Sequence, residues 1–145
     1  MPRRILNNNM LYIMDACALI AFLRDEQGAE IVTNILKLAK EGKAEICMNS
    51  INLLEVYYDI YRNVGRVKAE EELLMIKNLP IIIQSSLSDK VFNEAGRFKA
   101  SYKVSLADSI ALGEAFVSGG DLLTADHHEF DVIEKQEKIK FCWIR

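Results

Sequence analysis

The sequence lacks the features that mark membrane, secreted and disulfide-linked chains. No apolar run approaches the roughly 20 residues of a membrane helix, and the basic residues 3–4 precede no sustained apolar stretch of the kind that a signal peptide needs. The three cysteines are odd in number and have no Cys-x-x-Cys spacing, which favours reduced thiols over disulfides or a zinc site. We therefore expect a cytoplasmic protein with no membrane segment.

The sequence also lacks a large excess of charge of either sign. The 18 basic and 21 acidic residues leave a net charge of -3, which argues against a generic basic nucleic-acid binder. This balance does not exclude an enzyme whose own acidic cluster is neutralised by a metal ion. Half of the 145 residues are apolar, which excludes disorder and is enough for the core of one domain.

With two prolines and seven glycines, the sequence shows no linker, repeat or low-complexity segment that would divide it. Met10 stands directly before the first apolar run. We expect residues 1–9 to form a flexible lead-in and residues 10–145 to form a single domain.

Short apolar runs alternate with helical patterns. The runs predict strands at 11–14, 45–48, 81–83, 122–124 and 141–144. The apolar periodicity predicts helices at 16–23, 28–41, 51–64, 66–79, 88–103 and 107–117. This alternation is typical of an α/β fold with a mainly parallel sheet covered by helices on both faces. Ligands of such sheets bind beyond the carboxyl ends of the strands.

Two aspartates fall at that binding edge. Asp15 follows the first expected strand directly, and Asp126 comes shortly after the strand at 122–124. Aspartate is also a preferred N-cap of helices, so capping is an open alternative for each residue taken alone.

Two further acidic residues lie on expected helices. Asp108 lies inside an apolar stripe, where an unpaired buried carboxylate is costly, so it needs a cation or hydrogen-bond donors. A first-turn aspartate satisfied by capping is the alternative. Glu55 shares the polar arc of the 51–64 helix with Asn52, so helix geometry alone favours a solvated side chain.

Carboxylates that converge on one point repel one another unless a cation lies between them. Magnesium and manganese prefer oxygen ligands, and such ions can activate water and stabilise an in-line phosphoryl displacement. The acidic pattern therefore suggests metal-dependent phosphodiester chemistry, although it does not select that reaction unaided.

Other polar and aromatic residues carry weaker signals. Lys103 and Arg97 are possible phosphate contacts, and the alternative is that both are ordinary solvated surface residues. His127 and His128 are expected in a loop or at a helix start, because adjacent histidines cannot easily point at one ion. Three tyrosines lie on the apolar arc of the 51–64 helix: Tyr57, Tyr58 and Tyr61. We expect them to pack in the core, with a protein interface as the alternative.

Taken together, the acidic motifs resemble those of PIN domains, and most closely those of the VapC-type toxin ribonucleases. The resemblance covers nearly the whole chain from Met10, with all motifs in order. The matching segments are YIMDACALI at 12–20, NSINLLEVY at 49–57, SLADSIAL at 105–112, and LTAD at 123–126 followed by FD at 130–131.

The resemblance implies a three-layer α/β/α sandwich with a parallel sheet of about five strands. It implies endonucleolytic cleavage of RNA with magnesium or manganese, a homodimer and a small antitoxin partner. By motif match, the carboxylates of the metal and catalytic site become Asp15, Glu55, Asp108 and Asp126. Thr124 is expected to orient Asp15 or Asp126, and Ser50 to cap the Glu55 helix or support the site in a similar way.

Two functions other than an RNA-cleaving toxin share part of this pattern. A receiver-like phosphoacceptor also places an aspartate after a strand, but it pairs that site with a late Lys-Pro, and no proline follows Pro80. A catalytically silent PIN-like binding module is the second alternative, and failure to bind metal would favour it.

Overall fold

The structure is a computed structural model, and it describes residues 9–145. Of the expected lead-in, residues 1–8 lie outside the described residues. Asn9 donates a hydrogen bond from its side chain to the carbonyl of Gly42 at 2.7 Å. This contact attaches the residue before the first strand to the turn that precedes the second.

Five parallel strands form one sheet in the order β3-β2-β1-β4-β5. The strands are β1 (Met10–Met14), β2 (Ala44–Asn49), β3 (Ile82–Gln84), β4 (Asp121–Thr124) and β5 (Phe141–Trp143). Each expected strand is present within one or two residues of its expected ends. The first strand of the chain is therefore the centre of the sheet, which explains why its apolar run does not alternate.

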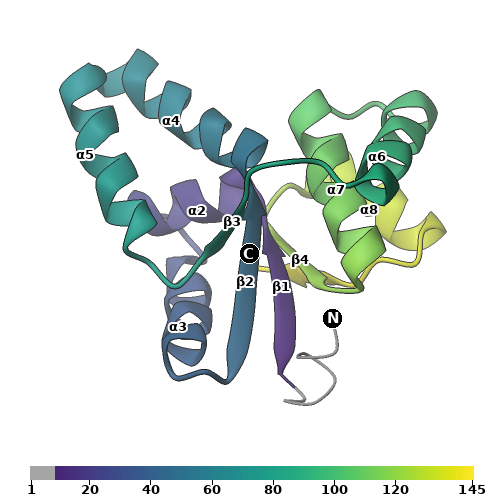
Figure 1. Ribbon diagram of the computed structural model, residues 1–145, viewed down its shortest axis with the longest axis horizontal. Helices are drawn as coiled ribbons and strands as arrows, with labels where there is room; N and C mark the ends of the chain where they lie inside the picture. The colour runs from purple at the N-terminus through teal and green to yellow at the C-terminus, as the bar shows by residue number, and fades with distance from the viewer. Residues whose placement is uncertain (1–8) are drawn as a thin grey trace.

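Helices cover both faces of the sheet, so the expected three-layer α/β/α architecture is confirmed (Figure 1). One layer holds α2 (Ala16–Leu23), α3 (Ala29–Lys40), α4 (Ser50–Val64) and α5 (Arg66–Lys77). The other holds α6 (Asp89–Ser101), α7 (Leu106–Ser118) and α8 (His127–Gln136). The sequence predicted at most a helix start at His127, whereas α8 continues for ten residues.

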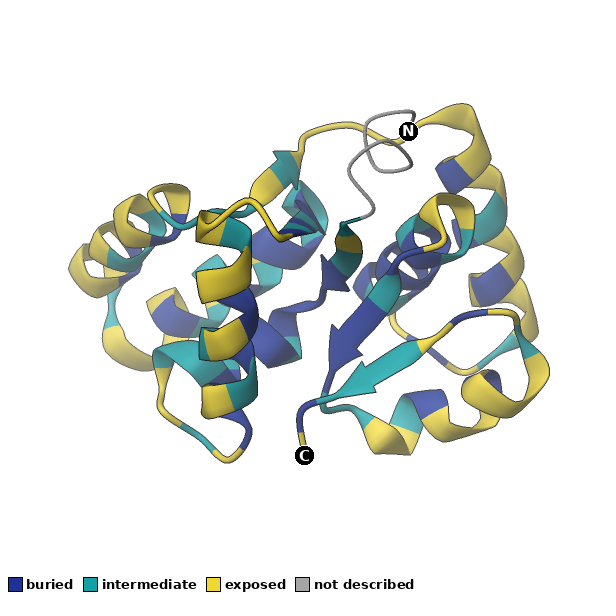
Figure 2. Ribbon diagram, turned by 90° about the horizontal axis from the view of Figure 1, so that it is seen from below, coloured by how far each residue is buried: buried dark blue, intermediate teal, exposed yellow. Residues whose placement is uncertain are grey.

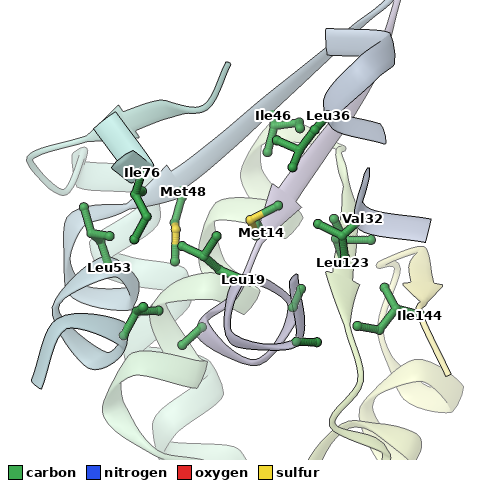
Figure 3. Close-up of a cluster of buried hydrophobic side chains, with 14 of the residues drawn as sticks. Met14, Leu19, Val32, Leu36, Ile46, Met48, Leu53, Ile76, Leu123 and Ile144 are labelled. Carbon is green, nitrogen blue, oxygen red and sulfur yellow. The ribbon is translucent and has the colours of Figure 1, made fainter. Parts of the chain in front are cut away.

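Each helical layer buries its own apolar cluster against the sheet. The larger cluster lies between β1, β2 and the layer of α2 to α5, and Figure 3 shows Met14, Leu19 and Met48 pointing into it. The second cluster joins Phe98 and Phe130 to the opposite face. Figure 2 shows the same division: buried residues lie on the central strands β1, β2 and β4, the edge strands β3 and β5 are partly exposed, and the helices expose their outer sides.

The prediction of core packing for the tyrosines of α4 is wrong for two of them. Tyr58 and Tyr61 are each 45% exposed, and Tyr57 is half-buried. The core is reached instead by Leu53, Val56 and Ile60 of the same helix. The apolar arc of α4 is wider than the face that the sheet covers, so its outer part remains at the surface.

The helices α6 and α7 cross closely at a glycine. A Cβ atom built on Gly113 would lie 3.1 Å from the backbone nitrogen of Ala95 and 3.2 Å from the carbonyl oxygen of Val91. These are backbone atoms of α6, which cannot move aside as the end of a side chain can. Gly113 therefore sets the distance between the two helices.

Because of this crossing, we expect a glycine-to-alanine substitution to have opposite effects on stability at Gly96 and Gly113. Alanine is the better helix former by about 1 kcal/mol, so Gly96→Ala, where a Cβ meets open space, should stabilise the protein by roughly 0.5–1 kcal/mol. Gly113→Ala should lower the stability instead, because the new methyl group meets the α6 backbone. Midpoints of urea unfolding compare the two, and equal stabilisation by both would contradict the close crossing.

Candidate active site

Asp15 lies at the end of the central strand and is almost completely buried, with 1% of its surface exposed. One carboxylate oxygen accepts a hydrogen bond from the backbone of Ala18 at 2.9 Å, and the other accepts the hydroxyl of Thr124. Asp15 is thus an N-cap of α2, as the alternative reading held. A capping role does not require a residue to be buried so completely. This burial raises the pKa of Asp15 to about 7.

Thr124 connects Asp15 to Asp126. Its hydroxyl donates to Asp15 and accepts the backbone N–H of Asp126 at 3.1 Å. The side chain of Asp126 in turn accepts the backbone N–H of Glu129 at 3.3 Å and caps α8. The charges of Asp108 and Asp126 add to the increase in the pKa of Asp15, so these three carboxylates lie near one another.

Asp108 is the third residue of α7 and is half-buried. Ser105 caps this helix by accepting the backbone N–H of Asp108 at 3.0 Å. Burial first, and then the charges of Asp126, Glu55 and Glu129, raise the pKa of Asp108 to about 6. Asp108 is therefore repelled by acidic side chains from both helical layers.

Glu55 is not the solvated side chain that helix geometry favoured. It is half-buried on α4, and burial raises its pKa. Its neighbour on the expected polar arc, Asn52, is only 1% exposed and donates to the carbonyl of Ala107 at 3.0 Å. Helix α4 packs against α7 as well as the sheet, so part of its polar arc is buried.

Asn49 was not among the expected site residues, yet it has two structural roles at the start of α4. Its side-chain oxygen accepts the backbone N–H of Ile51 at 3.0 Å, so Asn49 caps α4 and the cap expected at Ser50 is wrong. Asn49 is the residue with extended backbone before the first helical residue, which is the position where a cap acts. Its amide also donates to Glu114 of α7 at 2.8 Å.

Glu129 is a further acidic residue that the sequence reasoning missed. Its charge raises the pKa of Asp108, so it belongs to the same acidic group. A sequence signal existed, because Asp126 and Glu129 have the three-residue spacing of a capping box at a helix start.

The two basic residues considered as phosphate contacts lie in different surroundings. Arg97 forms ion pairs with Glu94 at 2.7 Å and Glu137 at 3.0 Å, and its guanidinium lies 4.5 Å from the ring centre of Phe98. These contacts give Arg97 a structural role between α6 and the segment after α8. Lys103 is exposed in the connection between α6 and α7.

The chemistry of the acidic group fits a hard divalent cation. Carboxylate oxygens are the ligands that magnesium and manganese prefer, and the raised pKa values of Asp15 and Asp108 reflect burial and mutual repulsion that a cation would relieve. Within residues 9–145, however, no three His, Cys, Asp or Glu side chains already form a metal-binding group. The donor set fits the ion, and the ligands would have to close around it.

Solved structures share the fold over nearly the full chain. VapBC2 from Rickettsia felis, bound to a DNA fragment from its promoter, matches with a TM-score of 0.70 and 17% identity, covering 92% of this chain and 98% of that chain. DNA-bound VapBC from Salmonella typhimurium matches with a TM-score of 0.69 and 15% identity, covering 94% and 99%. VapBC-1 from nontypeable Haemophilus influenzae gives 0.69 and 14%, covering 93% and 98%. At these identities the likeness establishes the fold.

The family follows from the sequence itself. The PIN domain family model matches residues 12–136, which include Asp15, Glu55, Asp108 and Asp126. The chain belongs to the PIN domain family, whose members are nucleases that generally use divalent metals. A comparison with curated protein sequences gives no match. In the part of the chain that the structure describes, no helix is both long and apolar enough to cross a membrane.

The buried acidic group predicts how stability depends on pH in metal-free protein. The pKa of Asp15 rises from 3.8 to about 7 on folding, so the folded state keeps a proton that the unfolded state has lost. This stabilisation is present below about pH 4 and is lost as the pH rises towards 7. Each such proton contributes a slope of up to about 1.4 kcal/mol per pH unit.

Urea unfolding in chelator across this pH range measures the slope. Asp15→Asn should flatten it, whereas Asp89→Asn, at an exposed residue in the first turn of α6, should leave the wild-type slope. An equal slope in wild type and Asp15→Asn would show that Asp15 titrates normally.

Proposed function

We propose that this protein is a magnesium- or manganese-dependent endoribonuclease, the VapC-type toxin of a toxin–antitoxin pair acting in the cytoplasm. One observation carries the proposal. The carboxylate of Asp15 is buried at the carboxyl edge of a parallel sheet, where Asp108 and Asp126 raise its pKa further. Such an arrangement is unfavourable without a cation, and perturbed groups of this kind cluster at functional sites.

Asp15, Glu55, Asp108 and Asp126 would hold the ion, which would supply a Lewis acid for activating water and for stabilising charge on the phosphate. Thr124 holds Asp15 and Asp126 in a fixed relation, and Ser105 fixes the start of the helix that carries Asp108. Water attacks the phosphorus in line as the bond to the 3′-oxygen breaks. The products are therefore a 5′-phosphate and a 3′-hydroxyl.

Loss of one carboxylate should remove most of the activity. Asp15→Asn preserves volume and removes a charge, so cleavage of total RNA should fall about 100-fold or more, as when one charge-stabilising group is removed elsewhere. Asp108→Asn should behave in the same way, and the exposed Asp89→Asn is the matched control. End-group analysis should find 5′-phosphates in the wild-type products.

Two outcomes would contradict this mechanism. A 2′,3′-cyclic phosphate product, or full activity in chelator, would point to a metal-free ribonuclease that uses the ribose hydroxyl. Circular dichroism shows whether Asp15→Asn is folded, since an unfolded variant would make Asp15 a structural residue.

A catalytically silent binding module is the second candidate. The observation that favours it is the lack of a ready metal-binding group within residues 9–145. The same cleavage assay separates the two functions, because a silent module leaves RNA intact with or without metal.

The proposal includes a homodimer and an antitoxin, and the outer surface of α4 and α5 supports protein contacts. Monomers rarely expose large contiguous apolar areas. A pocket of about 360 Å³ opens between α4, α5 and β3, and Leu53, Tyr57 and Leu73 are among the residues that line it. Seven large apolar side chains are exposed on these helices: Leu54, Tyr58, Tyr61, Val64, Val67, Leu74 and Met75.

Light scattering at micromolar concentration should therefore give a dimer. Val67, which is 73% exposed on α5, is a suitable position to place a charge in the interface. Val67→Glu should yield a monomer, whereas Val132→Glu, at a 55% exposed valine on α8, should remain dimeric. A monomeric wild type would count against the dimer.

A further inference from the structure

Three aromatic rings form a continuous stack beside the acidic group. The rings of Phe141 and Trp143, on β5, are 5.2 Å apart with an interplanar angle of 11°. The ring of His127 lies 3.8 Å from that of Trp143 at 13°. Phe141 also contacts the buried Phe130 at 5.8 Å, so the inner end of the stack is anchored in the core.

The stack runs towards the binding edge of the sheet. Phe141 and Trp143 are two residues apart on one strand, so their side chains share a face. Because β5 is parallel to the other strands, the order from Phe141 through Trp143 to His127 leads from the core to the carboxyl edge. His127 is the outermost ring, and it directly follows Asp126.

The stack also lies in register with Asp15. Trp143 pairs with Thr124 across β4 and β5, and Thr124 donates its hydroxyl to Asp15 at the end of β1. Neighbouring strands are about 4.8 Å apart, so the backbone of Trp143 lies roughly 10 Å from that of Asp15. A nucleotide beside a phosphodiester bound at Asp15 can reach the stack.

The outer face of His127 is open and the ring is held rigidly. Its Nδ1 lies 2.9 Å from a carboxylate oxygen of Asp131, and its Nε2 lies 2.8 Å from the carbonyl oxygen of Arg145. Its inner face covers Trp143, whose indole N–H donates to Glu134 at 3.1 Å. The His127 side chain is nevertheless 48% exposed. With both nitrogens and one face in contact, the exposed area belongs mainly to the other face.

We propose that this face of His127 is a stacking platform for a nucleobase of the RNA substrate, an inference that rests on the proposed ribonuclease function. Unpaired bases stack on aromatic side chains, histidine included, and this contact tolerates every base because each has a π-face. An acidic site on a chain of net charge -3 offers little electrostatic attraction to RNA. Stacking supplies affinity that does not depend on positive charge.

The test measures binding of a short single-stranded oligoribonucleotide to the Asp15→Asn protein in magnesium, where cleavage is suppressed. Trp143 is the single tryptophan of the chain, so its fluorescence reports directly on the platform. In this background His127→Leu should weaken binding about 5- to 150-fold, which corresponds to the roughly 1–3 kcal/mol typical of one base–aromatic stack. His127→Phe, which keeps an aromatic face, should restore it.

The neighbouring histidine provides the matched control. His128 is exposed, so His128→Leu should bind the oligoribonucleotide as the parent does. Inorganic polyphosphate, which has no bases, should bind all of these proteins equally. In the active enzyme, His127→Leu should raise KM more than it lowers kcat.

An abasic oligoribonucleotide keeps the test valid if His127→Leu perturbs the fold. It should bind the unaltered platform less tightly than the intact oligoribonucleotide, and that difference should vanish in His127→Leu. Equal binding of intact RNA by His127→Leu and the parent, or equal losses in His127→Leu and His127→Phe, would overturn the platform. Cleavage by the wild-type protein is measured separately. If the protein does not cleave RNA but its RNA binding depends on the His127 ring, the proposed nuclease function is wrong and the stacking platform is still supported.

Discussion

The buried carboxylate of Asp15 is the constraint on which the rest of the candidate site depends. An ionised group with 1% exposure is unfavourable unless donors or a cation compensate it. The structure provides two donors, the N–H of Ala18 and the hydroxyl of Thr124. They come from α2, which follows β1 in the chain, and from β4, which pairs with β1 in the sheet. The positions of these elements therefore fix the carboxylate. The two hydrogen bonds only partly offset the cost of burying its charge, so its pKa stays near 7.

The acidic group is assembled from both helical layers. Glu55 comes from α4 on one face of the sheet and Asp108 from α7 on the other. The two helices meet through polar contacts, in which Asn52 donates to the carbonyl of Ala107 and Asn49 donates to Glu114. The Asn52 bond is buried and the Asn49 bond is half-buried, and both connect the two helical layers beside the acidic side chains.

Most of the fold could be predicted because the strands are short, apolar and separated by clear helical patterns. Asp15 and Asp126 could be placed at one edge because each follows an expected strand, and the carboxyl ends of parallel strands share an edge. The surroundings of Glu55 could not, because α4 packs against both the sheet and α7, and one periodicity cannot indicate two buried faces. Helix α8 escaped prediction because only Phe130 and Ile133 of its ten residues are buried.

The hydrogen bond between Thr124 and Asp15 joins residues 109 positions apart in the sequence. The central strand β1 is the first of the five strands to be made, whereas its partner β4 is the fourth. Long-range parallel pairing of this kind forms late, and domains fold as synthesis proceeds from the N-terminus. A partly synthesised chain that stops before β4 therefore holds Asp15 without Thr124, so the hydrogen bonds around this carboxylate are complete only once β4 has been made and has paired with β1.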